Sequence, residues 1–214
     1  ILDKMLVFTE LEDSYGWLNQ SGKFTFKSAW DAFRAKSGKV PWYDLIWFKH
    51  RVNRHSFCAW MALNEGLLTL DNLKRRGISL VNMCVLCRKN EESTRHLMFE
   101  CIYAKVVWRI FLRKCNIHHT IGGCFMELEW LTQLIRNNKH TGHIIQASFT
   151  SFISMIWEER NRRIFEDQKL ETYILGQNLI HRVKEILDAF HLKDICLTHC
   201  PFLHTFWDEH NPCP

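Results

Sequence analysis

The sequence predicts a mostly helical fold with a short extended or hairpin segment at its start and a metal-binding knuckle where one helix begins. Glycine and proline are scarce, at nine and four of 214 residues, which argues against a turn-rich β architecture. Hydrophobic residues make up 47% of the chain, so it can bury a sizeable core, and disorder is not expected. Apolar residues recur at three- and four-residue steps, which is the period of an amphipathic helix.

The first forty residues are predicted to contain a short lead-in, an extended segment and one helix. Residues 1–13 form the lead-in. A Ser-Gly pair and alternating phenylalanines over residues 17–26 suggest a small hairpin or extended segment. Residues 28–33 are predicted as a helix that ends by Gly38, and Pro41 would prevent its continuation.

Longer helices are predicted further along the chain, and they set the expected domain organisation. Thr69 should cap a brief helix that Gly77 ends in the left-handed conformation. The polar run 137–141 is the best internal break. We expect one helical domain over 14–168, followed by a C-terminal helix and an undetermined tail over 169–214. The predicted helices cover 42–66 (one or two helices), 70–76, 97–115, 125–135, 142–166 and 172–190.

Four potential metal ligands lie within eighteen positions, in the pattern Cys-x2-Cys-x8-His-x4-Cys. They are Cys84, Cys87, His96 and Cys101. Zinc takes four such ligands tetrahedrally, and a set of three cysteines and one histidine leaves no position open for a reactive water. The pattern therefore predicts one structural zinc ion in a closed site. The other interpretation is a set of buried cysteines without a metal.

The spacing between the last two ligands constrains the local fold. His96 and Cys101 are five residues apart, which is about 140° around an ideal helix, so a straight helix cannot aim both at one ion. Either the helix starts near Cys101, or His96 lies in an irregular turn before it, which a cap at Ser93 or Thr94 would favour. In both cases the ion would fix the start of the helix against the Cys-x2-Cys turn.

The sequence carries no motif of catalysis, secretion or membrane insertion. It has no Gly-rich phosphate loop, no nucleophile elbow and no pair of acids placed for catalysis, so we do not expect an enzyme. No signal peptide is visible, and no apolar run approaches the roughly 18 residues of a membrane span. Nine cysteines, an odd number, fit reduced thiols inside the cell better than a disulfide framework.

Basic residues cluster around the predicted knuckle, and the chain has a mild net charge of +5. Five of them could contact the phosphates of a nucleic acid. The alternative is a solvated rim interspersed with Glu91, Glu92 and Glu100. The aromatic residues at positions 99, 103 and 108 could stack on bases, although their helical spacing favours packing in the core. The five basic residues are Arg75, Arg76, Arg88, Lys89 and Arg95.

A second metal site is conceivable in the C-terminal tail, which is rich in cysteine and histidine. The spacing of these residues fits no common zinc finger, so a set of side chains without a metal is the favoured interpretation. The residues are Cys196, His199, Cys200, His204, His210 and Cys213.

Several short motifs on both sides of the knuckle carry a family resemblance. They are Thr69-Leu70-Asp71-Asn72-Leu73-Lys74-Arg75-Arg76-Gly77, Cys84-x2-Cys87, Glu92-Ser93, His96-Leu97-Met98-Phe99-Glu100-Cys101, Val107-Trp108 and Ile156-Trp157-Glu158-Glu159-Arg160-Asn161-Arg162-Arg163-Ile164-Phe165. As a set they resemble the reverse-transcriptase zinc-binding domain of plant LINE-type (non-LTR) retrotransposon polyproteins and their derivatives. The resemblance covers about 14–168 and assigns zinc to the same four ligands. Without a polymerase or RNase H-like domain, the chain resembles a retrotransposon-derived remnant or host-adopted fragment.

The resemblance implies a non-catalytic, zinc-stabilised module that binds nucleic acid, single-stranded RNA before DNA, in the nucleus or the cytoplasm. One alternative is a host-adopted protein-interaction scaffold that docks a partner through apolar helix faces, such as the stripe from Ile145 to Trp157. A third possibility is that the fold persists with no selected activity.

Overall fold

The computed structural model describes residues 24–34, 38–137 and 139–192. The chain divides into two compact units, 1–39 and 40–214. The domain boundaries near residues 13 and 168 stay predictions. The lead-in, most of the expected hairpin segment and the Cys/His-rich tail lie outside the described residues.

In the first unit the structure describes one helix, α1 (Phe26–Phe33). Its first turn is closed by a reciprocal capping box, in which the Ser28 amide donates to Thr25 Oγ1 and the Thr25 amide donates to Ser28 Oγ, both at 3.0 Å. The helix therefore begins at Phe26, two residues earlier than predicted. The assignment of Phe26 to an extended segment was wrong. It rested on the alternation of Phe24 and Phe26, whereas Thr25 caps a helix that starts at Phe26.

In the second unit the described residues are mostly helical, which confirms the predicted fold class. They contain no strand, and the nearest approach to one is an isolated antiparallel bridge between Met83 and Glu91. No described helix is both long and apolar enough to cross a membrane. The elements are α2 (Tyr43–Ile46), α3 (Asn53–Leu63), α4 (Leu70–Arg75), the π-helical turn η1 (His96–Glu100), α5 (Ile102–Lys114), α6 (Cys124–Asn137), α7 (Lys139–Phe165) and α8 (Thr172–Ala189).

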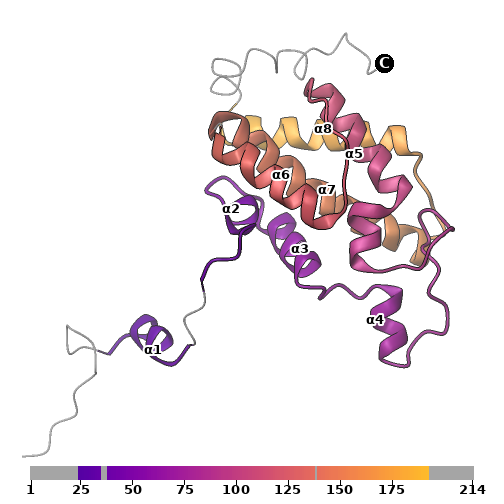
Figure 1. Ribbon diagram of the computed structural model, residues 1–214, viewed down its shortest axis with the longest axis horizontal. Coiled ribbons are helices and arrows are strands. Elements are labelled where there is room, and N and C mark those ends of the chain that lie inside the picture. The colour runs from indigo at the N-terminus through magenta and orange to yellow at the C-terminus, as the bar shows by residue number, and fades with distance from the viewer. Residues whose placement is uncertain (1–23, 35–37, 138, 193–214) are drawn as a thin grey trace, which may run out of the picture. The chain divides into compact units, whose positions relative to one another are not determined.

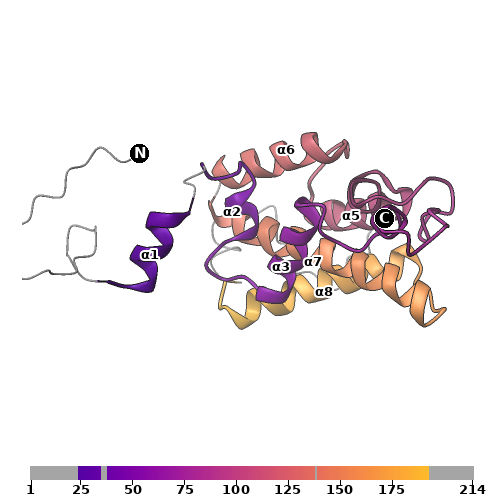
Figure 2. The ribbon, with the colours of Figure 1, turned by 90° about the horizontal axis from the view of Figure 1, so that it is seen from below.

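The long helix α7 is the centre of this unit. Helices α3, α6 and α8 all pack against it, and α5 packs against α8. Figure 1 shows α5 crossing α8, and Figure 2 shows α6 and α8 on opposite sides of α7. Helix α6 ends at Asn137 and α7 begins at Lys139, so most of the break predicted over 137–141 is helical.

The apolar stripe of α7 lies inside the chain's own core. Ile145, Phe149, Ile153 and Ile156 are each at most 1% exposed. The proposal that this stripe docks a partner protein was wrong, because neighbouring helices of the same chain already cover it. An amphipathic pattern shows that one face is buried but does not show what buries it.

The short helix α4 ends as its sequence predicts. Gly77 has a φ of 71°, and the amide of Ile78 donates to the Leu73 carbonyl at 2.9 Å, which closes the last turn. The loop that follows carries the chain toward the predicted metal ligands.

Helices α5 and α8 pack closely against each other at Gly176. A Cβ atom placed there would lie 2.8 Å from Cγ2 and 3.1 Å from Cβ of Ile110, and the Ile110 Cβ is fixed by its own backbone. Gly176→Ala should therefore lower the free energy of unfolding by about 1–2 kcal/mol in urea titrations, although alanine is the better helix former.

Gly142 in α7 is the matched control, because its added Cβ would meet Ile135 Cγ2 at an ordinary 3.4 Å. Gly142→Ala should be neutral or stabilise the protein by about 0.5–1 kcal/mol. Equal effects of the two substitutions would contradict the close α5–α8 crossing.

Candidate metal centre

The four predicted ligands come together at one point. The ligand atoms of Cys84, Cys87, His96 and Cys101 all lie within 4.8 Å of one another. Cys84 Sγ is 4.0 Å from Cys101 Sγ, and Cys87 Sγ is 3.4 Å from His96 Nε2. A tetrahedral zinc with bonds of about 2.3 Å to sulfur would separate two sulfurs by about 3.8 Å. The cluster therefore has the size and the donor set of a zinc site.

An irregular turn allows His96 and Cys101 to face the same point. His96 begins the π-helical turn η1, and the amide of Cys101 donates to the His96 carbonyl at 2.7 Å. Cys101 itself is extended, with φ −62° and ψ 127°, and is the N-cap residue of α5. The amide of His96 donates a hydrogen bond to Ser93 Oγ at 3.1 Å. Both geometric solutions that the sequence allowed are thus present together, with Ser93 as the cap.

The other two ligands lie in a tight loop. The amide of Arg88 donates to the Cys84 carbonyl at 2.8 Å, and the amide of Cys84 donates to the Asn90 carbonyl at 2.9 Å. These bonds hold the Cys-x2-Cys turn closed. Arg88 completes the turn in the left-handed conformation, with φ 54°.

Hydrogen bonding and burial shift the protonation equilibria of the cluster in different directions. The thiol–thiol hydrogen bond raises the pKa of Cys84 and lowers that of Cys101. Burial lowers the pKa of His96, which keeps the ring neutral and its lone pair available for a metal. A cation at the centre would stabilise the thiolates that it needs as ligands.

A buried carboxylate connects the loop that carries Cys84, Cys87 and Glu92, which we call the knuckle loop, to the helical bundle. Glu92 is completely buried, and its Oε1 accepts hydrogen bonds from Arg160 Nη2 at 2.9 Å and Nε at 3.1 Å. The same oxygen accepts from the Leu70 amide at 2.8 Å. Glu92 therefore caps α4 in place of the Thr69 side chain, whose hydroxyl contacts Asp71 instead. It also cannot belong to the solvated rim that the sequence allowed.

Arg163 makes a second connection between α7 and the knuckle. Its Nη1 donates to the Leu86 carbonyl at 3.1 Å, and its Nε donates to Glu159 at 2.7 Å. The guanidinium also lies 4.5 Å from the ring centroid of Tyr103. The charged end of α7 thus has an intramolecular role. Sequence reasoning did not identify the residues that the arginines of α7 contact. Glu92 and Arg160, for example, both lie in motifs of the family resemblance, but their pairing was not predicted.

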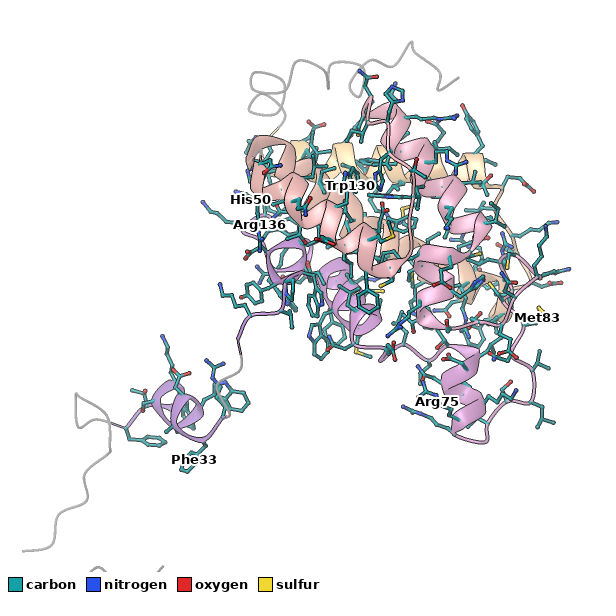
Figure 3. All side chains as sticks on the ribbon, in the orientation of Figure 1. Phe33, His50, Arg75, Met83, Trp130 and Arg136 are labelled. Atoms are coloured by element: carbon teal, nitrogen blue, oxygen red, sulfur yellow. The ribbon has the colours of Figure 1, made fainter. Side chains whose placement is uncertain are left out.

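The predicted phosphate contacts are exposed but differ in their surroundings. Arg75, which projects from α4 in Figure 3, pairs with Asp71 at 3.7 Å, and Arg95 pairs with Glu65 at 3.0 Å. The other three have no ion pair or hydrogen bond from their side chains within the described part of the chain; they are Arg76, Arg88 and Lys89. The aromatic residues at 99, 103 and 108 are buried, as their spacing predicted.

The sequence of this region matches a known family. Residues 24–108, which include all four candidate ligands, match the family described as zinc-binding in reverse transcriptase. Over this stretch the chain is therefore similar to zinc-binding domains of the reverse-transcriptase type.

Two proteins from Arabidopsis thaliana are similar to parts of this chain. An uncharacterized mitochondrial protein is 33% identical over 86 residues, which cover 39% of this chain and 60% of the relative. A putative ribonuclease H protein is 24% identical over 105 residues, which cover 47% of this chain and 17% of the relative. The chain thus spans less than two thirds of either protein. No solved structure matches the chain.

The buried ion pair can be tested by removing one partner. Arg160→Met should lower the free energy of unfolding by about 3–5 kcal/mol in urea titrations, because the Glu92 charge would stay buried without its partner. The double variant Glu92→Met with Arg160→Met should recover part of this loss.

Arg162→Met is the control, because Arg162 is about one third exposed and Glu159 keeps its second partner, Arg163. Its cost should stay under about 1 kcal/mol. A cost for Arg160→Met no larger than that of the control would contradict the role assigned to the pair.

Proposed function

We propose that the chain binds one zinc ion through Cys84, Cys87, His96 and Cys101, and that this ion stabilises a non-catalytic module for single-stranded nucleic acid, RNA before DNA. We place the module inside the cell, in the nucleus or the cytoplasm. The observation that supports the proposal best is the convergence of four soft and borderline ligand atoms within 4.8 Å. The match to a zinc-binding family supports the same metal.

A structural role for zinc follows from the ligand count. Four protein ligands complete a tetrahedral shell and leave no position at which a water or substrate could be activated. Three of the ligands are buried and the fourth, Cys87, is half-buried. The ion would join the Cys-x2-Cys turn to η1 and to the first turn of α5.

Zinc binding can be tested by metal analysis of the purified chain. Elemental analysis should give one zinc per chain, and a chelator or Cys84→Ser should release it and lower the melting temperature, because binding of this kind contributes on the order of 10 kcal/mol to folding.

Cys124→Ser is the matched control, since Cys124 is a half-buried thiol outside the cluster. It should keep one zinc. Metal-free wild-type protein with an unchanged melting temperature would contradict the site, and two zinc ions would point to a further set of ligands.

The exposed cations provide the charge for a nucleic-acid surface. Three of these side chains make no ion pair or hydrogen bond within the described residues, namely those of Arg76, Arg88 and Lys89. The pairs Arg75–Asp71 and Arg95–Glu65 lie at the surface, where an ion pair contributes less than about 1 kcal/mol. A phosphate can therefore compete for these two arginines at little cost.

The RNA-binding role predicts a salt-dependent effect of the α4 arginines. Arg75→Ala with Arg76→Ala should weaken binding to single-stranded RNA and reduce the slope of log K against log salt by about 0.7 for each phosphate that is no longer neutralised. Fluorescence anisotropy over a salt series measures both quantities.

The control is Arg109→Ala with Arg113→Ala, which removes two exposed charges from α5. If the two double variants weaken binding equally, general charge and not the α4 arginines governs the affinity.

A protein-interaction scaffold is the competing function, and one surface favours it. An apolar hollow of about 530 Å³ lies between the end of α3, η1 and α6. Its wall includes Trp42, Leu63, Phe99 and Phe125, and Phe125 is 70% exposed. Assembly of the pure protein in solution, together with no affinity for RNA, would support the scaffold over the nucleic-acid module.

A further inference from the structure

We propose that a single strand of nucleic acid passes through a cleft beside the zinc knuckle, where Arg88 and Lys169 bind its phosphates and Val81 and Met83 contact its bases. This inference rests on the proposed function and names the path of the strand. The cleft lies between the knuckle loop and the connection from α7 to α8, and we call it the knuckle cleft. It is lined by residues 81 and 83–88 on one side and by Arg163 and residues 167–169 on the other.

The knuckle cleft is large enough for a nucleotide. Its volume is about 580 Å³, within the range of about 300–1,000 Å³ that holds small organic ligands. It is open to solvent, so a strand can enter and leave without a change of fold. Two of the proposed zinc ligands, Cys84 and Cys87, belong to its wall, so the ion would also hold the cleft in shape.

One exposed basic side chain lies on each side of the cleft. Arg88 and Lys169 are both exposed, and neither side chain has an ion pair or hydrogen bond to any other described residue. Arg163 adds positive charge, although its donors are already bonded to Glu159 and to backbone carbonyls. Asp167 contributes one opposing charge. The balance favours an anion, and the two free cations are the groups available to contact it.

Apolar side chains at the edge of the cleft suit the bases of the strand. Val81 is 64% exposed and Met83 is 46% exposed, and Figure 3 shows Met83 at the outer edge of the molecule. Single-strand sites combine cations for the phosphates with an apolar surface, usually aromatic, for the base faces, and here Val81 and Met83 supply an aliphatic surface of this kind. The flexible Met83 side chain can adapt to different bases, so the cleft should bind with little sequence preference.

The backbone on both sides of the cleft is unusual. Arg88 has a φ of 54° and Asp167 has a φ of 50°. Non-glycine residues seldom adopt this left-handed conformation, and such residues concentrate at functional sites. At Arg88 an asparagine would tolerate the same backbone and would remove only the long cationic side chain. Arg88→Asn therefore separates binding from folding.

The test uses the zinc-loaded, full 214-residue chain and fluorescein-labelled single-stranded RNA of mixed sequence. Arg88→Asn with Lys169→Gln should weaken binding about ten-fold in about 0.1 M salt and lower the salt slope by about 1.4, as expected when two phosphates are no longer neutralised. Arg109→Gln with Arg113→Gln on α5 removes the same charge outside the cleft and should change the affinity by less than about two-fold.

The apolar edge is tested separately. Val81→Ser with Met83→Ser should weaken binding several-fold without a change in the salt slope, because no charge is removed. The control is Ile102→Ser with Ile174→Ser, which removes side chains of similar exposure from α5 and α8. Its affinity should match that of the wild type.

The outcomes separate this inference from the proposed function. Wild-type protein that binds no strand at low salt would overturn both. Wild-type protein that binds RNA while the cleft and control variants lose affinity equally would overturn only the knuckle cleft. Loss of affinity confined to the cleft variants, with unchanged zinc content and melting temperature, would support it.

Discussion

The carboxylate of Glu92 is the point at which the separate parts of the second unit are joined. One oxygen accepts hydrogen bonds from the first turn of α4 and from two nitrogens of Arg160 on α7. Burial of a charge is costly unless its partner and its hydrogen bonds are in place. The knuckle loop, α4 and α7 must therefore all adopt their final positions before Glu92 becomes stable in the interior. This requirement couples a short loop to the core of the bundle.

The knuckle can be stabilised by two kinds of interaction, a metal ion within it and hydrogen bonds from the arginines of α7. The four ligand residues span eighteen positions, so an ion there can order only the local segment. The Glu92–Arg160 pair joins residues 68 positions apart, and Arg163 reaches back 77 positions to the Leu86 carbonyl. The metal would thus order the local conformation of the knuckle, while Arg160 and Arg163 fix its position relative to α7. A surface built on the knuckle needs both.

Local signals in the sequence predicted most of the helices and the identity of the ligand cluster. The five-residue gap between His96 and Cys101 required an irregular turn, and the structure has one at that place. The interpretation of the stripe on α7 failed, because periodicity does not identify the covering surface. The Glu92–Arg160 pair was missed for a similar reason. A carboxylate in a loop and an arginine on a distant helix give no local pattern, and only the tertiary fold brings them together.

The π-helical turn at His96–Glu100 has a consequence for the tolerance of this chain to insertions. An extra or missing residue there would rotate α5 by about 100° relative to the cluster. Val107 and Trp108, now buried, would turn away from the interior while Cys101 kept its place. The number of residues in this turn is therefore set jointly by the convergence of His96 with Cys101 and by the apolar face of α5. Length variation should be tolerated far better in the exposed loop before the knuckle, where neither constraint acts.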